Sequence, residues 1–402
     1  HTRCSRDWSS DVCSSDLRGK PSILWLVGKL SHRQTFTDLV MPTTEQIHQA
    51  IQTVIDPLTG QALAGSKNTK NLSVNGGDVS FEVELGYPAK SLHNDLRQQL
   101  IAAVRAVPGV QNVSVQLSTQ VVAHAAQRGV ALMPQVKNII AVASGKGGVG
   151  KSTTAVNLAL ALAAEGAKVG LLDADIYGPS QPMMMGIDAR PETEDGQTME
   201  PLENFGVQVM SIGFLINPDE AMIWRGPMAT QALEQLLRQT NWKDLDYLIV
   251  DMPPGTGDIQ LTLSQRVPMT GAVIVTTPQD IALLDARKGI RMFEKVGVPI
   301  LGIVENMAVH VCSNCGHTEH IFGADGGKRM AAELQTTHLG ALPLDMQIRL
   351  QADSGMPTVV AHPEGEVTRL YRQIALQVAA KIALKSKDFS SKFPSIKISK
   401  DT

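Results

Sequence analysis

The chain has 402 residues, of which 43% are hydrophobic and 19% charged, as in a soluble globular protein with two or three domains. A net charge of −3 and an aromatic content of 4% argue against a basic, base-stacking nucleic-acid binder. No apolar run reaches the roughly 18 residues of a membrane span. Four cysteines are too few for a disulfide framework in a chain of this length. We therefore expect a cytoplasmic protein without a nucleic-acid or membrane partner.

The two ends of the chain differ in character from the rest. Residues 1–40 include a Ser/Asp-rich stretch without helical or strand periodicity, and they carry Cys4 and Cys13. We expect a non-native or disordered extension here, with a native disordered arm as the alternative, and we leave both cysteines out of the site. Residues 386–402 are rich in lysine and serine and are predicted to form a disordered tail.

Residues 41–118 are predicted to form a small α+β domain. Apolar residues recur at helical spacing at Ile47, Ile51, Val54 and Ile55, and again between Leu92 and Val104. Strands are predicted near 72–74, 81–85 and 110–117, and Asn75-Gly76-Gly77 is a hairpin signal between the first two. No catalytic constellation occurs in this segment, and residues 119–136 form the expected linker.

Residues 137–385 alternate apolar strands with helices, which predicts an α/β domain with a mostly parallel sheet flanked by helices. Buried parallel strands are continuous apolar runs rather than alternating ones. The predicted strands are Ile139–Ala143, Val169–Leu172, Val207–Ile212, Tyr247–Val250, Ala272–Thr276, Ile300–Val304 and Leu339–Leu342.

Residues 145–152 match the phosphate-loop pattern, in which four variable residues separate two glycines and a lysine and a serine follow. A strand precedes the match and an apolar helix at 153–164 follows it, which is the context that the pattern requires. Glycines bring backbone N–H groups to the phosphates, Lys151 supplies positive charge, and the Ser152 hydroxyl is a ligand for Mg²⁺. We expect ATP to bind at Gly145, Lys146, Gly147, Gly148, Val149, Gly150, Lys151, Ser152 and Thr153.

The string from Lys146 to Thr153 resembles the deviant Walker A loop of a particular ATPase class. That class contains the septum-positioning and chromosome-partition ATPases and the nitrogenase iron protein. Its early lysine reaches across a dimer interface to the partner's nucleotide, by the charge-stabilising logic of an arginine finger. The resemblance therefore implies an ATP-dependent homodimer in which Lys146 serves the partner. Taken alone, a lysine at this position would be a solvated surface charge.

Two of the predicted strands end in aspartates. Asp251 follows the strand at 247–250, the arrangement of a Walker B carboxylate that holds Mg²⁺. After the strand at 169–172, the class resemblance implies that Asp175 orients the attacking water, whereas Asp173 caps the turn or supports the metal site. An isolated strand-end aspartate would by default have only a turn or cap role. Asn306 resembles the adenine-contacting asparagine of the class.

Cys312-Ser313-Asn314-Cys315 is a C-x-x-C pair that precedes His317 and His320. Two thiolates do not complete a [4Fe–4S] site, which normally takes four, but two copies of the chain in a symmetric dimer would supply them. Zinc held by the two cysteines and two histidines of one chain is an alternative, although the spacing is too tight for a zinc finger. A redox-active or inert pair is a third interpretation.

Taken together, the motifs resemble those of the Mrp/ApbC family of iron–sulfur cluster carrier ATPases over about residues 41–385. The motifs that carry the resemblance are the deviant loop, Asp173–Ser180, Trp224–Met228, Asp251–Asp258, Glu305–Met307 and Cys312–Cys315. The resemblance implies an N-terminal iron–sulfur-assembly-like domain at 41–118 and a P-loop ATPase domain at 137–385. The N-terminal segment has no cysteine, which puts a cluster-binding role for it in doubt.

The resemblance implies a slow ATPase that uses ATP and Mg²⁺, binds a [4Fe–4S] cluster at a homodimer interface through Cys312 and Cys315, and passes the cluster to apo-proteins. A positioning or partition-type ATPase is one alternative, because such proteins share the P-loop and the dimer, although they have no use for the cysteine pair. They often carry a basic amphipathic C-terminal helix that binds a membrane. The amphipathic segment Val367–Leu384 is instead interpreted as a core-packing helix. A zinc-stabilised P-loop ATPase is the other alternative.

Overall fold

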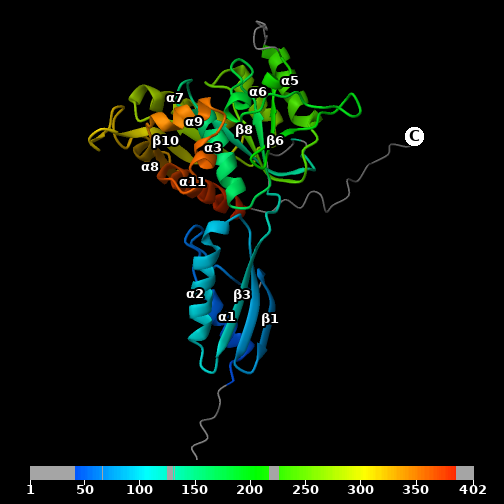
Figure 1. Cartoon of the computed structure of the whole chain (residues 1–402), viewed down its shortest axis with the longest axis vertical. Helices are drawn as coiled ribbons and strands as arrows, with labels where there is room; N and C mark the ends of the chain where they lie inside the picture. Colours follow the sequence, from blue (N-terminus) through cyan, green and yellow to red (C-terminus); the bar gives the residue numbers. More distant parts are fainter. Residues whose placement is uncertain (1–40, 66, 125–129, 131, 217–225, 386–402) are drawn as a thin grey trace, which may run out of the picture. The chain divides into compact units, whose positions relative to one another are not determined.

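The computed structural model describes residues 41–65, 67–124, 130, 132–216 and 226–385. The chain divides into two units, residues 1–40 and residues 41–402, and the second is described by itself. The predicted extension at 1–40 and the predicted tail at 386–402 lie outside the described residues. Figure 1 shows the helices and strands of the described part with their labels.

The N-terminal part is a three-stranded sheet with two α-helices, as the sequence predicts. In the sheet order β1-β2-β3, the first pair is antiparallel and the second parallel. Alternate residues of β2 are buried, so that one face of the strand carries the apolar side chains. The elements are α1 (Thr44–Gln52), β1 (Thr69–Asn75), β2 (Asp78–Leu85), the short 3₁₀ helix η1 (Lys90–Leu92), α2 (His93–Arg105) and β3 (Asn112–Thr119).

Two residues of the first predicted helix, Val54 and Ile55, lie beyond the end of α1. Ile47 and Ile51 are buried on α1, but Ile55 is 51% exposed because the helix ends at Gln52. The chain turns at Asp56, whose buried carboxylate accepts hydrogen bonds from the Tyr87 hydroxyl and a backbone N–H of the turn. This turn removes Ile55 from the helical face that its spacing predicts. The Gly76-Gly77 hairpin between β1 and β2 is confirmed.

The following part is built on one mixed sheet. Among the described residues it has nine strands in the order β11-β10-β9-β4-β8-β5-β7-β6, with β12 paired to β10. All its pairings are parallel except β6 with β7 and β11 with β10. The strands are β4 (Val136–Ala143), β5 (Val169–Asp173), β6 (Leu202–Asn204), β7 (Val207–Ser211), β8 (Leu245–Asp251), β9 (Gly271–Thr276), β10 (Ile300–Val311), β11 (Thr318–Glu319) and β12 (His338–Pro343).

The seven predicted strands of this part are present, and the differences lie at the sheet edges. The short edge strands β6 and β11 were not predicted, because two or three residues carry no readable periodicity. Strand β10 continues seven residues past its predicted end at Val304. This extension brings the strand directly to the cysteine pair, for which the sequence indicates only a loop.

Helices cover the sheet. Two of them matter for the functional predictions: the helix that follows the phosphate loop and the amphipathic helix near the C-terminus. Helix α3 (Lys151–Ala164) is buried on nearly every side and packs against β4, β5, β8 and α11. Helix α11 (Glu366–Ala383) buries Ile374, Val378 and Ile382, which confirms its interpretation as a core-packing helix. The remaining helices are α4 (Gln181–Met184), η2 (Ile212–Phe214), α5 (Gly226–Gln239), α6 (Asp258–Arg266), α7 (Asp280–Lys295), α8 (Gly326–Glu333), α9 (Met346–Asp353) and α10 (Thr358–Ala361).

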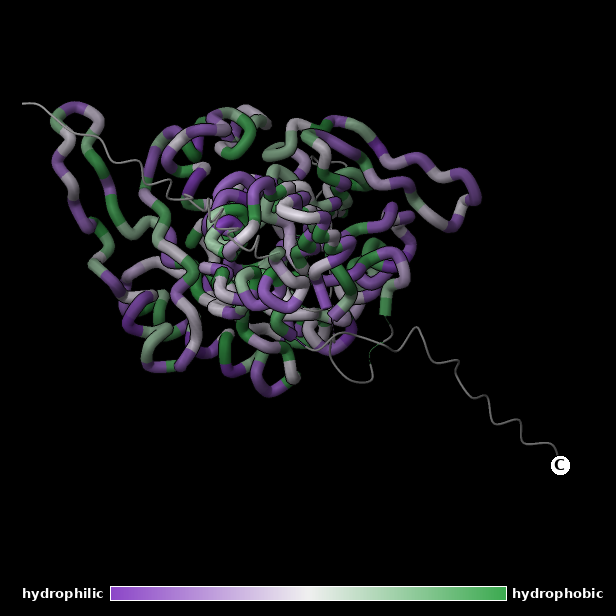
Figure 2. Tube along the Cα trace, turned by 90° about the horizontal axis from the view of Figure 1, so that it is seen from below, coloured by the Kyte–Doolittle hydropathy of each residue, from purple (hydrophilic) through white to green (hydrophobic). Residues whose placement is uncertain are grey.

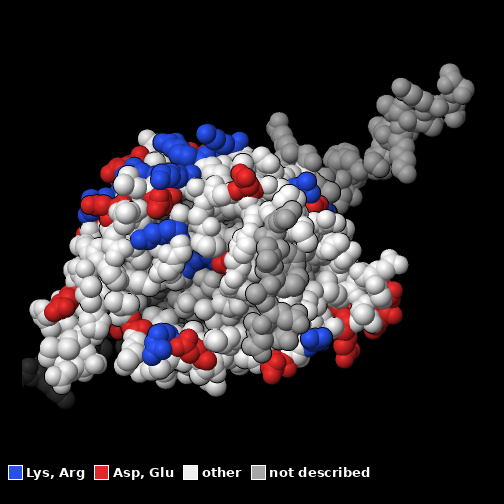
Figure 3. Space-filling model, turned by 90° about the horizontal axis from the view of Figure 1, so that it is seen from above, with Lys and Arg blue, Asp and Glu red and all other residues white. Residues whose placement is uncertain are grey.

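Apolar stretches along the chain are short and are repeatedly interrupted by polar ones, as the alternating green and purple of the tube shows (Figure 2). Within the described residues, no helix is both long enough and apolar enough to span a membrane. On the face shown in Figure 3, lysine and arginine gather along one edge with acidic groups beside them.

Candidate nucleotide site and cysteine pair

The phosphate loop runs from the end of β4 to the start of α3, in the middle of the sheet. Gly150 caps the helix with a left-handed backbone, at φ +79°, which a residue with a side chain rarely adopts. A Cβ on Gly150 would lie 2.1 Å from Asn306 Nδ2. A Cβ on Gly145 would lie 2.1 Å from the backbone of Asp285 in α7. Both glycines therefore let other elements approach the loop closely. By contrast, a Cβ on Gly147 would meet no protein atom within 4 Å, so the loop has an open side that suits phosphate groups.

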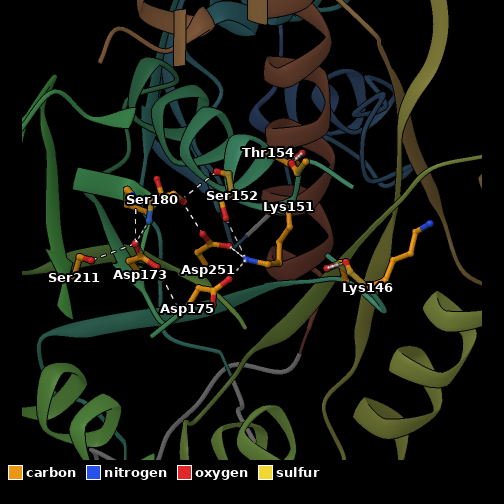
Figure 4. A network of polar contacts seen from close by, with 12 residues as sticks. Lys146, Lys151, Ser152, Thr154, Asp173, Asp175, Ser180, Ser211 and Asp251 are labelled. Carbon is orange, nitrogen blue, oxygen red and sulfur yellow. Dashed lines mark hydrogen bonds and ion pairs between the residues drawn. The ribbon is translucent and has the colours of Figure 1, made fainter. Parts of the chain in front are cut away.

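Lys151 is 6% exposed, and its ammonium group lies among oxygen atoms (Figure 4). It donates a hydrogen bond to Asp251 Oδ1, lies 3.2 Å from Ser152 Oγ, and is 3.8 Å from Asp175 Oδ2. The structure thus brings together four residues that the sequence selected from three separate segments. The positively charged ammonium group of Lys151 lies between the Asp251 carboxylate and the Ser152 hydroxyl. Hard oxygen donors of this kind are the ligands that Mg²⁺ prefers. The donor set therefore fits magnesium.

Two carboxylates stand side by side at the carboxyl ends of β5 and β8, where Asp173 pairs in register with Asp251. Both are fully buried. Burial, together with the negative charge of Asp251, raises the pKa of Asp173 to about 7. Burial also raises the pKa of Asp175, against the opposing effect of the Lys151 charge.

Asp173 holds the loop that carries Asp175. Its Oδ1 accepts the backbone N–H of Asp175 at 3.1 Å, and its Oδ2 accepts those of Ser180 and Gln181 at 2.9 and 3.0 Å. The Ser211 hydroxyl contacts the same Oδ2 at 3.2 Å (Figure 4). These contacts agree with the cap role that the sequence suggests for Asp173, and its alternative role as a support for the metal site stays a prediction.

Sequence reasoning did not select Gln181, the first residue of α4. Its side chain is fully buried, and its Nε2 donates to Asp251 Oδ2 at 2.9 Å and to the Ser152 carbonyl at 3.1 Å. The only available signal was its position directly after the Asp173–Ser180 motif. Periodicity could not have identified it, because a single polar residue beside a turn is usually exposed.

Asn306 lies against the phosphate loop, where its Nδ2 donates to the Val149 carbonyl at 2.9 Å. The pairing of β10 with β12 is irregular between Glu305 and Val309, and Met307 has a left-handed backbone at φ +56°. Such irregularities in a strand redirect side chains and are frequent beside active sites. The adenine contact expected for Asn306 stays a prediction.

Lys146 extends away from Lys151 and the carboxylates (Figure 4). Its Nζ donates to Gln279 Oε1 at 3.4 Å, beside the start of α7. The loop's two lysines therefore point in different directions, and only Lys151 lies among the carboxylates of its own chain.

The cysteine pair begins directly after β10, in the tight connection to β11. His317 and Cys312 close this connection, because the Cys312 N–H donates to the His317 carbonyl at 2.9 Å. The Cys312 sulfur accepts backbone N–H groups of Asn314 and Cys315, which lowers the pKa of its thiol. Cys312 is half-buried and Cys315 exposed, and both thiols are free. Backbone donors aimed at a sulfur favour the thiolate, the form that binds metals.

The single-chain zinc site considered above is not assembled in the part of the chain that the structure describes. There, no three histidine, cysteine, aspartate or glutamate side chains form a group that could hold a metal ion. His320 turns its Nδ1 toward the Ala308 carbonyl at 2.8 Å, and His317 lies 3.7 Å from Glu319.

The phosphate loop, its buried lysine and the two strand-end carboxylates define a P-loop NTPase. The family model described as NUBPL iron-transfer P-loop NTPase matches residues 135–379, and the model described as iron-sulfur cluster assembly protein matches residues 44–116. The chain therefore belongs to the family of NUBPL iron-transfer P-loop NTPases. This confirms the predicted fold class and the resemblance to the Mrp/ApbC carriers.

Named relatives agree with this assignment. The iron-sulfur cluster carrier protein of Escherichia coli (strain K12) is 56% identical over 308 residues, covering 76% of this chain and 84% of the relative. The iron-sulfur cluster transfer protein NUBPL of Mus musculus is 54% identical over 249 residues, covering 61% and 78%. A nucleotide-binding protein from Archaeoglobus fulgidus, solved in complex with ADP, is 37% identical with a TM-score of 0.51, covering 58% of this chain and 90% of that one.

Proposed function

We propose that this protein is an ATP-hydrolysing carrier that binds a [4Fe–4S] cluster between two copies of itself and transfers it to apo-proteins in the cytoplasm. Strand β10 is the observation that carries the proposal. Its Asn306 contacts the phosphate loop, and the strand ends directly before Cys312. One strand thus joins the nucleotide loop to a pair of free thiols. The names of the relatives, which are cluster carriers and a cluster transfer protein, support the same function.

The cluster is the cargo, and the thiols of two chains would hold it. A [4Fe–4S] cluster takes four cysteine thiolates, and each chain offers Cys312 and Cys315. A two-fold symmetric dimer places the same surface of each copy at the interface and so supplies four. The direction of Lys146, away from its own carboxylates, supports its predicted role at the partner's nucleotide.

In the hydrolysis that we propose, Lys151 leaves Asp251 to neutralise the β- and γ-phosphates of ATP. Ser152 and Asp251 would hold Mg²⁺, which neutralises phosphate charge. Asp175, on the loop organised by Asp173, would orient the attacking water. The catalytic residues are thus Lys146, Lys151, Asp175 and Asp251. A slow rate is part of the proposal, because hydrolysis then depends on assembly of the dimer.

Anaerobic reconstitution with iron and sulfide tests the cargo site. We expect about four iron and four sulfide per wild-type dimer, as one [4Fe–4S] cluster requires. Cys312→Ala and Cys315→Ala should lose the cluster and its visible absorption but still bind ADP. Lys151→Ala is the matched control, which should lose nucleotide binding and keep the cluster. Full iron and sulfide in the double cysteine variant would show that the site lies elsewhere.

The structure bears differently on the two alternatives. In a positioning ATPase, the apolar side of the C-terminal helix must be available to a membrane, whereas here Ile374, Val378 and Ile382 of α11 are buried. ATP-dependent sedimentation with liposomes would nevertheless favour that function. Metal and sulfide analysis of protein purified without oxygen distinguishes a zinc-stabilised ATPase from a cluster carrier, because the zinc protein would contain zinc and no sulfide.

A further inference from the structure

Gln181 joins three parts of the nucleotide site. Its backbone N–H is held by Asp173, and its side-chain amide reaches both Asp251 on β8 and Ser152 at the start of α3. These contacts connect the loop of residues 174–180, the magnesium-binding carboxylate and the first turn of the phosphate-loop helix.

The contacts determine the orientation of the Gln181 amide. Asp251 Oδ2 and the Ser152 carbonyl are both acceptors, so only the NH₂ end of the amide can face them. The other end, Oε1, is buried and has no hydrogen-bond partner among the described residues. A fully buried, unpartnered polar atom is uncommon, and such atoms call for a functional explanation. An apolar residue of similar size would avoid this cost, so packing alone does not explain a glutamine here.

The two oxygens of the Asp251 carboxylate have different partners. Lys151 contacts Oδ1, and Gln181 holds Oδ2. If Lys151 turns to the phosphates, as the proposed hydrolysis requires, Gln181 would still hold Oδ2 and Oδ1 would be free for the metal. The amide would then restrain rotation of the carboxylate after its lysine partner has left.

We propose that Gln181 is a positioning residue that holds Asp251 in its magnesium-binding orientation and couples that orientation to the loop carrying Asp175. The inference rests on the nucleotide chemistry of the proposed function and adds to it a residue that none of the predicted motifs contains. The loop can then respond to the bound metal, because Gln181 directly follows the loop and its side chain contacts Asp251.

The test compares ADP binding by calorimetry with Mg²⁺ and with a chelator, in the full chain. Replacing partners of metal ligands typically lowers metal affinity by about 10- to 100-fold. Mg²⁺ should increase the ADP affinity of the wild type, and in Gln181→Leu this increase should be at least about tenfold smaller. The affinity for ADP in the presence of the chelator should differ by less than about twofold between the two proteins. In hydrogen exchange, Mg²⁺-ADP should protect residues 174–180 in the wild type and not in the variant.

Gln351→Leu is the matched control, since Gln351 is also buried, has an unpartnered Oε1 and belongs to α9. It should leave the Mg²⁺ dependence unchanged. If Gln181→Leu does not fold, Gln181→Met, which keeps the unbranched shape, takes its place. If Gln181→Leu weakened ADP binding equally with and without Mg²⁺, or did not weaken it at all, the inference would be overturned and the proposed function would still stand. Failure of the wild type to bind Mg²⁺-ADP would instead overturn the nucleotide chemistry itself.

Discussion

Asn306 Nδ2 lies 2.9 Å from the carbonyl oxygen of Val149, and this hydrogen bond joins β10 to the phosphate loop. Six residues further along the same chain is Cys312. The nucleotide loop and the thiol pair are therefore connected through one strand, within one protomer, in addition to any contact that a dimer would add.

We expect Asn306→Ala to weaken nucleotide binding, because the loop loses a contact that supports its conformation. A neutral hydrogen bond contributes about 0.5–1.5 kcal/mol, so ADP affinity should fall roughly 2- to 10-fold. Calorimetric titration with Mg²⁺-ADP measures the change. Asn112→Ala, at an exposed position of β3, is the control and should bind normally. An unchanged affinity in Asn306→Ala would mean that β10 does not support the loop.

Two glycines of the loop should respond differently to alanine. In Gly150→Ala, the left-handed backbone and the approach of Asn306 should lower the free energy of unfolding by about 1–2 kcal/mol or more. In Gly147→Ala, no protein atom is near, so the unfolding free energy should change by less than about 0.5 kcal/mol. Its Cβ would stand on the open side of the loop, so ADP binding should still weaken at least about tenfold.

Urea unfolding and ADP titration of both glycine variants separate these effects. Gly150→Ala should lose stability and binding together, whereas Gly147→Ala should lose binding alone. If both variants lost the same unfolding free energy, the conclusion that the loop is open at Gly147 would be wrong.

The buried carboxyl group of Asp173 should make stability depend on pH. Its pKa is about 7 in the folded protein and about 4 in the unfolded chain, so between these values the folded state binds more protons. The contribution of the Asp173 carboxyl group to the free energy of unfolding is therefore fully present below about pH 4, and it decreases as the pH rises toward 7.

Asp173→Asn removes this titration. Urea unfolding of metal-free protein at pH 5 and pH 8 should show that the stability advantage of the wild type over the variant is larger at pH 5. An advantage that is equal at both values, or larger at pH 8, would contradict the raised pKa.

Cys312 should react with iodoacetamide at a lower pH than an ordinary thiol, because backbone N–H groups stabilise its thiolate. The measurement uses a chain with Cys4, Cys13 and Cys315 replaced by alanine, so that one thiol remains. The midpoint of the rate against pH should lie below the ordinary value of about 8.5.

Gly316→Val tests the cause of this shift. Gly316 has a left-handed backbone at φ +71°, and its N–H donates to the Cys312 carbonyl at 2.8 Å. Valine strains this turn, so the midpoint should return toward the ordinary value. No difference between the two chains would show that the turn does not set the reactivity of Cys312.

The sequence by itself determined the features that depend on local spacing. The glycine pattern before Lys151, the apolar strands that end in Asp173 and Asp251, and the separation of Cys312 from Cys315 each lie within a few consecutive residues. Local spacing constrains backbone conformation directly, and the register of a parallel sheet then brings the strand ends together at one edge.

Only the tertiary structure decided which side chains meet at that edge. Gln181 reaches Asp251 across 70 residues of sequence, and Asn306 reaches Val149 across 157. Asp173 became the anchor of the loop because its oxygens face three backbone N–H groups, which a strand-end aspartate does not reveal in the sequence. Contacts of this kind depend on strand order, an irregular strand and close packing. Those are properties of the assembled sheet, which no short stretch of sequence encodes.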